Sequence, residues 1–115
     1  MKDMNKIKVV PLEFLLELQE NEEDFKLVEA LTEKAYNMGH LPGAMFMPIN
    51  RVEELAPLHL SKDDKIVVYC TGYTCHASTR VSRKLMDMGY ENVFEFKAGK
   101  AGWKKAGFKM VGEIK

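Results

Sequence analysis

Residues 66–89 read IVVYCTGYTCHASTRVSRKLMDMG, and this stretch predicts a strand, a loop and a helix in direct succession. The run IVVYC, residues 66–70, is apolar and mostly β-branched, which suits a central strand buried on both faces. Beyond the loop, apolar residues at helical spacing predict a helix over residues 75–88 that ends at Gly89. The apolar face of this helix would consist of Ala77, Val81, Leu85 and Met88.

Strand and helix patterns alternate along the rest of the chain. Further strands are predicted at residues 7–10, 25–30, 44–47 and 92–96, and further helices at residues 12–18, 30–38 and 99–106, with short helix and loop at residues 51–60. This alternation predicts an α/β layer structure with a mainly parallel sheet. No repeat and no Pro/Gly/Ser-rich linker divides residues 1–115, so we expect one domain.

The composition excludes several classes of protein. The chain has 115 residues, 46% of them hydrophobic, which is enough for a core and argues against disorder. No apolar run approaches the roughly 18 residues of a membrane span, and the first ten residues lack the apolar stretch of a secretory signal. Two cysteines are too few for a disulfide scaffold. We therefore expect a cytoplasmic protein with no membrane partner.

The formal net charge is zero, which argues against a nucleic-acid partner. The zero hides an asymmetry, because residues 1–60 hold 6 basic and 11 acidic residues and residues 61–115 hold 11 basic and 6 acidic ones. Either the two signs face each other on the folded surface, or the second half carries a basic surface around an anion-handling site. The lysines near the end of the chain are most simply a solvated helix face: Lys97, Lys100, Lys104 and Lys105.

Cys70 is the first candidate for chemistry. It ends the predicted central strand, and ligand sites in α/β sheets lie beyond the carboxyl ends of the strands. Inward-pointing N–H groups of the following loop and the helix N-terminus would favour its thiolate and lower its pKa. Such a cradle would also stabilise a persulfide. The alternative is a buried structural cysteine. The loop itself consists of Thr71, Gly72, Tyr73 and Thr74.

Four residues after this loop are further candidates. Cys75 could resolve an oxidised Cys70, share transferred sulfur, or be a passive helix-start residue. His76 could donate to a bound anion, Ser78 suits a helix start, and Arg80 could reach the loop mouth, although His76 and Arg80 also suit solvated positions. One cysteine pair without a second pair does not indicate a metal site, so we expect no metal and no other cofactor.

Three segments resemble rhodanese-like domains. GHLPGAMFMPI, residues 39–49, is similar to the family signature G-H-I-P-G-A-x-x-I-P. IVVYC and its loop resemble the family's active-site strand, and residues 89–112 resemble its last segment, with Gly99 and Trp103 at the G-x-x-x-W positions. The resemblance implies a three-layer domain with a central five-stranded, mainly parallel sheet flanked by helices.

The same resemblance implies a function. In this family the catalytic cysteine, here Cys70 by position, accepts sulfane sulfur as a persulfide held by the backbone N–H groups of residues 71–75. The sulfur then passes to a thiol or another thiophilic acceptor. The implied partners are therefore a thiol acceptor and a sulfur donor such as thiosulfate, a polysulfide or a protein persulfide.

The loop departs from the family pattern C-x-x-G-x-R. Its sixth residue is Cys75 instead of Arg, and aligning Ser78 with the family's Ser leaves Ala77 at the Arg position. In the second strand, Glu29 replaces the usual Asp and Leu31 the usual Arg. Two cations that would bind a small oxyanion are thus missing unless Arg80 or His76 replaces them. Counted back from Gly89, the loop is also about two residues longer than is usual in the family, and a larger loop could accept a donor bulkier than thiosulfate, such as a polysulfide or a protein persulfide.

Three functions follow from these residues. The first is a sulfurtransferase or persulfide carrier acting through Cys70. The second is a catalytically weak rhodanese-like module for partner binding or redox sensing. The third is a thiol-dependent arsenate reductase that uses Cys70 and Cys75 as a disulfide pair. Phosphatase relatives use C-x5-R, and His76 in the place of that Arg argues against phosphatase chemistry.

Overall fold

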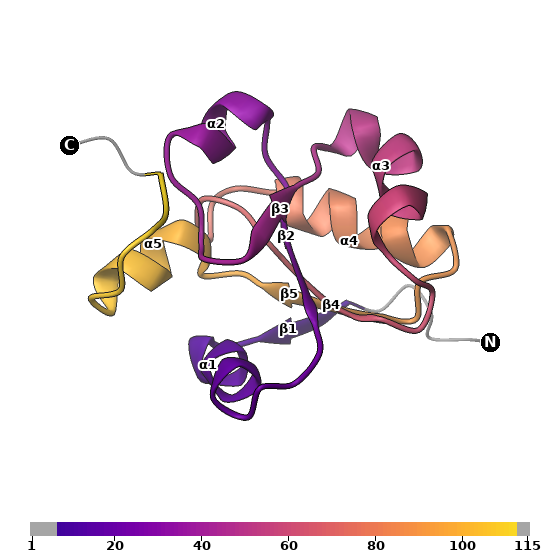
Figure 1. The fold of residues 1–115 in the computed structure, drawn as a ribbon. Helices are drawn as coiled ribbons and strands as arrows, with labels where there is room; N and C mark the ends of the chain where they lie inside the picture. Colours follow the sequence, from indigo (N-terminus) through magenta and orange to yellow (C-terminus); the bar gives the residue numbers. More distant parts are fainter. Residues whose placement is uncertain (1–6, 113–115) are drawn as a thin grey trace.

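A computed structural model describes residues 7–112, which form a parallel sheet with helices on both faces (Figure 1). The sheet has five strands in the order β1-β5-β4-β2-β3, and every neighbouring pair is parallel. The elements in chain order are β1 (Lys8–Val10), α1 (Leu12–Glu20), β2 (Lys26–Glu29), α2 (Glu33–Asn37), β3 (Ala44–Phe46), a 3-10 turn η1 (Ile49–Arg51), α3 (Val52–His59), β4 (Lys65–Tyr69), α4 (Ala77–Asp87), β5 (Asn92–Phe96) and α5 (Gly99–Lys105).

β4 lies in the middle of the sheet, between β5 and β2. Val67 pairs with Leu27 of β2 and with Phe94 of β5, and residues 66–69 are all fully buried. A strand covered on both faces needs an apolar run without polar alternation, which is the pattern of IVVYC. The predicted central strand is confirmed.

Helices cover both faces of the sheet (Figure 1). Each face has its own apolar cluster. On one face, Val52 and Leu55 of α3 and Val81 and Leu85 of α4 pack against the sheet. On the other face, the apolar residues of α1 and α5 do so, with Trp103 of α5 buried among them. The predicted α/β fold with a five-stranded parallel sheet flanked by helices is therefore confirmed.

Two helices begin later than predicted. α2 starts at Glu33, because the Ala30 N–H still bonds to the Tyr69 carbonyl in the manner of the sheet and Thr32 caps the helix by accepting the Ala35 N–H. α4 starts at Ala77, because residues 70–76 form a loop. Cys75 is therefore a loop residue and not the first residue of the helix.

The carboxyl ends of all five strands lie at one edge of the sheet, since every pair is parallel. Glu29 of β2, Tyr69 of β4 and Phe96 of β5 end their strands at this edge, directly before the segments that carry the candidate residues. Within residues 7–112, no helix has the length and apolar character needed to cross a membrane.

Candidate functional site

The loop after β4 is fixed by the start of α5. The N–H groups of Lys100 and Ala101 donate to the carbonyl oxygens of Cys70 and Thr71, both at 2.9 Å. Gly99 makes this approach possible, because a Cβ on it would overlap the Cys70 carbonyl oxygen and because its φ is +59°. Backbone contacts between α5 and the loop therefore set the position of Cys70.

Cys70 follows β4 directly and is fully buried. Its Sγ lies 3.4 Å from the Cys75 carbonyl oxygen and 3.4 Å from the Ser78 Oγ. Burial raises the pKa of the Cys70 thiol, and the neighbouring Cys75 raises it further. The Ser78 hydroxyl and N–H act in the opposite direction but do not reverse the shift. This differs from the lowered pKa expected from the sequence, because burial penalises the thiolate more than the nearby donors favour it.

Cys75 is a free, partly exposed cysteine on the same loop. Burial acts to raise the pKa of its thiol, but hydrogen bonds outweigh this and the pKa of Cys75 is lowered. These bonds come from the Cys70 thiol, the Ala77 N–H and the hydroxyl and N–H of Thr71. The donors of the loop and of the first turn of α4 thus lower the pKa of Cys75, whereas sequence analysis expected them to lower that of Cys70.

A buried carboxylate lies behind the loop. The Glu95 side chain on β5 is 2% exposed, and its Oε2 accepts hydrogen bonds from the hydroxyls of Ser78 at 2.5 Å and Thr79 at 2.8 Å. The Lys97 Nζ lies 3.5 Å from the same oxygen, 3.2 Å from the Thr79 hydroxyl and 3.4 Å from the Cys75 carbonyl oxygen. A continuous chain of polar contacts therefore runs from Cys70 through Ser78 to Glu95 and Lys97.

Sequence analysis missed Glu95 and assigned Lys97 to a solvated helix face, which is wrong. Lys97 lies in the segment between β5 and α5, and its side chain is only 21% exposed because it pairs with Glu95. The available signal was a charged residue inside the apolar strand NVFEF, residues 92–96. Such a residue needs a partner when it is buried.

The other candidate residues are distributed around the loop. Gly72 is buried, whereas Thr71, Tyr73, Thr74, His76 and Arg80 are exposed. Within residues 7–112, no side-chain hydrogen bond or ion pair joins His76 or Arg80 to either cysteine, so the cation beside the loop is that of Lys97.

A second buried cluster lies beside the loop. The Tyr69 hydroxyl donates to the Glu29 Oε1 at 2.6 Å and accepts the Leu41 N–H at 3.0 Å. The Lys100 Nζ lies 3.0 Å from the Glu29 Oε2 and donates to the Ala35 carbonyl oxygen at 3.2 Å. The outward position expected for Lys100 is therefore wrong, because the buried Glu29 requires a counter-charge and the Lys100 side chain is only 14% exposed.

Comparison with known proteins agrees with this architecture. The family model of the rhodanese-like domain matches residues 12–106. The chain belongs to the rhodanese-like domain family. It is 33% identical over 97 residues to a tRNA uridine(34) hydroxylase of Onion yellows phytoplasma (strain OY-M), a match that covers 79% of this chain and 30% of that protein. The chain therefore spans less than a third of the length of this curated relative.

Solved structures share the rhodanese-like fold. The Alr3790 protein from Anabaena sp. has a TM-score of 0.82 and 32% identity, with 91% of this chain and 81% of that chain covered. A thiosulfate sulfurtransferase from Pseudomonas aeruginosa superposes with a TM-score of 0.79, and the match covers 94% of this chain and 21% of the sulfurtransferase. At 21% identity, this second similarity concerns the fold alone.

Two further features of this rhodanese-like domain bear on ligands. Among residues 7–112, no group of three or more His, Cys, Asp or Glu side chains is arranged to hold a metal ion.

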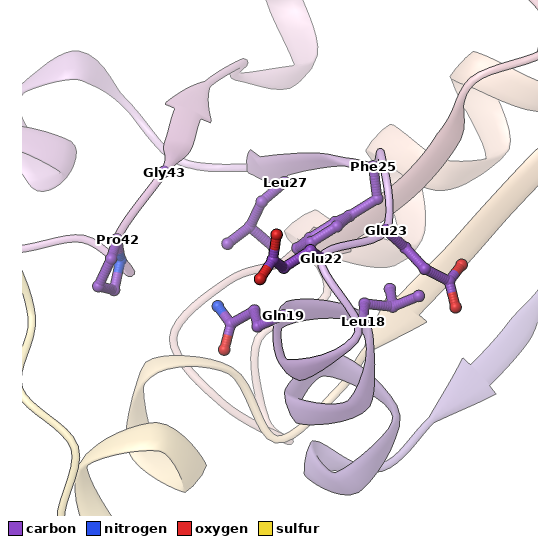
Figure 2. A pocket seen from close by; sticks show the side chains of 8 residues that line it. All are labelled: Leu18, Gln19, Glu22, Glu23, Phe25, Leu27, Pro42 and Gly43. Carbon is purple, nitrogen blue, oxygen red and sulfur yellow. The ribbon is translucent and has the colours of Figure 1, made fainter.

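An open groove of about 350 Å³ lies between the end of α1 and β2 and is also lined by Pro42 and Gly43 (Figure 2). Phe25 and Leu27 place it near the amino ends of the strands, away from the edge that carries Cys70.

Proposed function

We propose that this rhodanese-like domain is a sulfurtransferase or persulfide carrier that stores sulfane sulfur on Cys70 and passes it to a thiol acceptor. One observation carries the proposal: two free thiols share one loop at the carboxyl edge of the sheet, with backbone N–H groups directed at their sulfur atoms. N–H groups that favour a thiolate also favour the anion of a persulfide.

The transfer has two balanced steps. A cysteine thiolate attacks the outer sulfur of a donor R–S–SH, so that the new S–S bond forms on the protein and RS⁻ leaves with the electron pair of the broken bond. An acceptor thiolate then attacks the outer sulfur of the protein persulfide and releases the cysteine as a thiolate. Neither step needs an added oxidant, and both suit a compartment that keeps thiols reduced, such as the cytoplasm.

Inorganic polysulfide and small-molecule persulfides are the expected donors. Thiosulfate carries two negative charges, and the Lys97 cation beside the loop is already paired with Glu95. An ammonium group also lacks the two-pronged geometry with which an arginine binds an oxyanion. We therefore expect slower loading from thiosulfate than from polysulfide at equal concentration.

Mass spectrometry of the reduced protein tests the proposal. Incubation with polysulfide should add one sulfur atom, about 32 Da, to a peptide that contains residues 70–75. The double variant Cys70→Ser/Cys75→Ser is the control and should gain no mass. If thiosulfate, polysulfide and a small-molecule persulfide all leave the wild-type mass unchanged, the proposal is wrong.

The closeness of two free cysteines on one loop, with the Cys70 Sγ 3.4 Å from the Cys75 carbonyl oxygen, favours a second candidate function, a redox-sensing module. Hydrogen peroxide would take two electrons and two protons from the pair, leaving water and a Cys70–Cys75 disulfide. A loss of about 2 Da after peroxide treatment, without any sulfur adduct from the donors, would favour this function over sulfur transfer.

A further inference from the structure

The two thiols of the loop differ in access. Cys70 is fully buried, whereas Cys75 is partly exposed on the same loop. Exchange of a sulfur atom requires the donor to reach the attacking sulfur directly, so access helps to set its rate. In the observed conformation Cys75 is therefore the more accessible of the two cysteines to a donor in solution.

The hydrogen-bond directions also separate the two thiols. The Ser78 hydroxyl donates to Glu95, and its oxygen lies 3.4 Å from the Cys70 Sγ as an acceptor for the thiol. The other oxygen beside Cys70, the Cys75 carbonyl, is also an acceptor. Burial raises the pKa of Cys70 more than the Ser78 hydroxyl and N–H lower it, so Cys70 keeps its proton more readily than an exposed thiol would.

The surroundings of Cys75 have the opposite character. Its sulfur accepts from the N–H groups of Thr71 and Ala77, and Ala77 is the first residue of the 11-residue helix α4. N–H groups at a helix start carry partial positive charge, which stabilises a nearby thiolate. The Thr71 hydroxyl adds a further donor.

We infer that sulfur enters this loop at Cys75, which attacks the donor and then hands the sulfur to the buried Cys70. The inference rests on the sulfur-transfer function proposed above and assigns its entry point. Cys75 is thus a catalytic residue in its own right, and Cys70 is the protected site at which the sulfur is held.

The relay balances without a further reactant. The Cys75 thiolate attacks the outer sulfur of R–S–SH, giving Cys75–S–SH and RS⁻. The Cys70 sulfur then attacks that outer sulfur, the bond to Cys75 breaks, and the Cys70 proton passes to the departing Cys75 sulfur of the same loop. The products are Cys70–S–SH and Cys75–SH, and no atom is oxidised overall.

Alkylation of the reduced wild-type protein tests the entry assignment without any sulfur donor. Limiting iodoacetamide at pH 7, followed by peptide mapping, should label Cys75 at least tenfold faster than Cys70. Each pKa unit between two thiols changes the ratio of their thiolate fractions by a factor of about ten. The greater exposure of Cys75 and its lower pKa should therefore both speed its alkylation. Guanidinium chloride should abolish the difference. Labelling of Cys70 first, or at an equal rate, overturns the inference.

Sulfur loading of two matched variants provides the second test. With inorganic polysulfide, Cys75→Ser should load Cys70 at least tenfold more slowly than the wild type, whereas Cys70→Ser should load quickly and keep the sulfur on Cys75. If Cys75→Ser loads as fast as the wild type, Cys75 is not the entry point. If no protein loads at all while Cys75 is still alkylated first, the sulfur-transfer function fails and the assignment of the reactive thiolate stands.

Discussion

At the scale of single residues, the two cysteines should titrate on opposite sides of an ordinary thiol pKa. Hydrogen bonds lower the pKa of Cys75, and burial raises that of Cys70. The ultraviolet absorbance of the thiolates should therefore rise in two steps as the pH increases, one below and one above the pKa of an ordinary cysteine. Cys75→Ser should lose the lower step and keep the upper one, because burial is the larger cause of the Cys70 shift. A single step near the pKa of an ordinary cysteine would contradict this prediction.

Two serines on α4 make a matched pair for stability. Ser78 and Ser82 are both fully buried, but Ser78 donates to Glu95, whereas the Ser82 hydroxyl has no hydrogen-bond partner among residues 7–112. Ser78→Ala leaves a buried carboxylate short of a donor and should lower the free energy of unfolding by about 1–3 kcal/mol. Ser82→Ala removes an unpaired hydroxyl, so it should be neutral or stabilising.

Urea denaturation of the two variants measures the difference. The contrast is informative because both substitutions delete one oxygen from the same helix. Equal losses in Ser78→Ala and Ser82→Ala would mean that the contact between Ser78 and Glu95 contributes nothing to stability.

At the scale of elements, the contact between α5 and the loop depends on one glycine. A Cβ at Gly99 would overlap the Cys70 carbonyl oxygen, and the φ of +59° adds strain. Gly107, which follows α5 with a φ of +93°, has open space around its Cβ position. Gly107→Ala should therefore cost only the backbone strain, about 1–2 kcal/mol. Gly99→Ala should cost about 3 kcal/mol or more, because backbone atoms must also move.

The two alanine variants should differ in thiol reactivity as well as in stability. Displacement of the Cys70 carbonyl would open the loop, so Gly99→Ala should react faster with a disulfide reagent than the wild type, whereas Gly107→Ala should keep the wild-type rate. The free energy of unfolding comes from urea titration and the thiol rate from absorbance. Equal stability of the two variants would show that the approach of α5 to Cys70 is not tight.

Sequence patterns predicted elements better than they predicted the site. The apolar run of β4 and the helical spacing in α4 reflect which faces are buried, and burial is what hydrophobic periodicity records. Glu95 and Lys100 are polar residues whose burial depends on partners far along the chain, and no periodic pattern records a pairing of that kind. Cys70 and Cys75 were found by position, but which of them carries the lowered pKa depends on hydrogen bonds at single atoms.

At the scale of the whole molecule, basic residues of the second half of the chain form ion pairs with acidic residues of the first half. Three ion pairs join a lysine of the basic half to a glutamate of the acidic half: Lys65 with Glu23, Lys84 with Glu53, and Lys100 with Glu29. Of the two explanations of the charge split, the observed pairs support the one in which opposite signs face each other. Two of the three pairs are at least one-third exposed on both partners, and only the pair with Glu29 is buried.

This difference predicts unequal consequences for two lysine substitutions. Lys100→Met leaves Glu29 as a buried charge without its cation, so the free energy of unfolding should fall by about 3–5 kcal/mol. Lys65→Met breaks an exposed pair with Glu23 and should cost about 0–1 kcal/mol. Urea titration at low and at 1 M sodium chloride separates the two cases, because salt screens exposed charges more than buried ones. The stability loss of Lys65→Met should disappear at high salt, whereas that of Lys100→Met should persist. Similar losses of unfolding free energy in both variants would contradict the assignment of Lys100 as the buried counter-ion that joins α5 to β2.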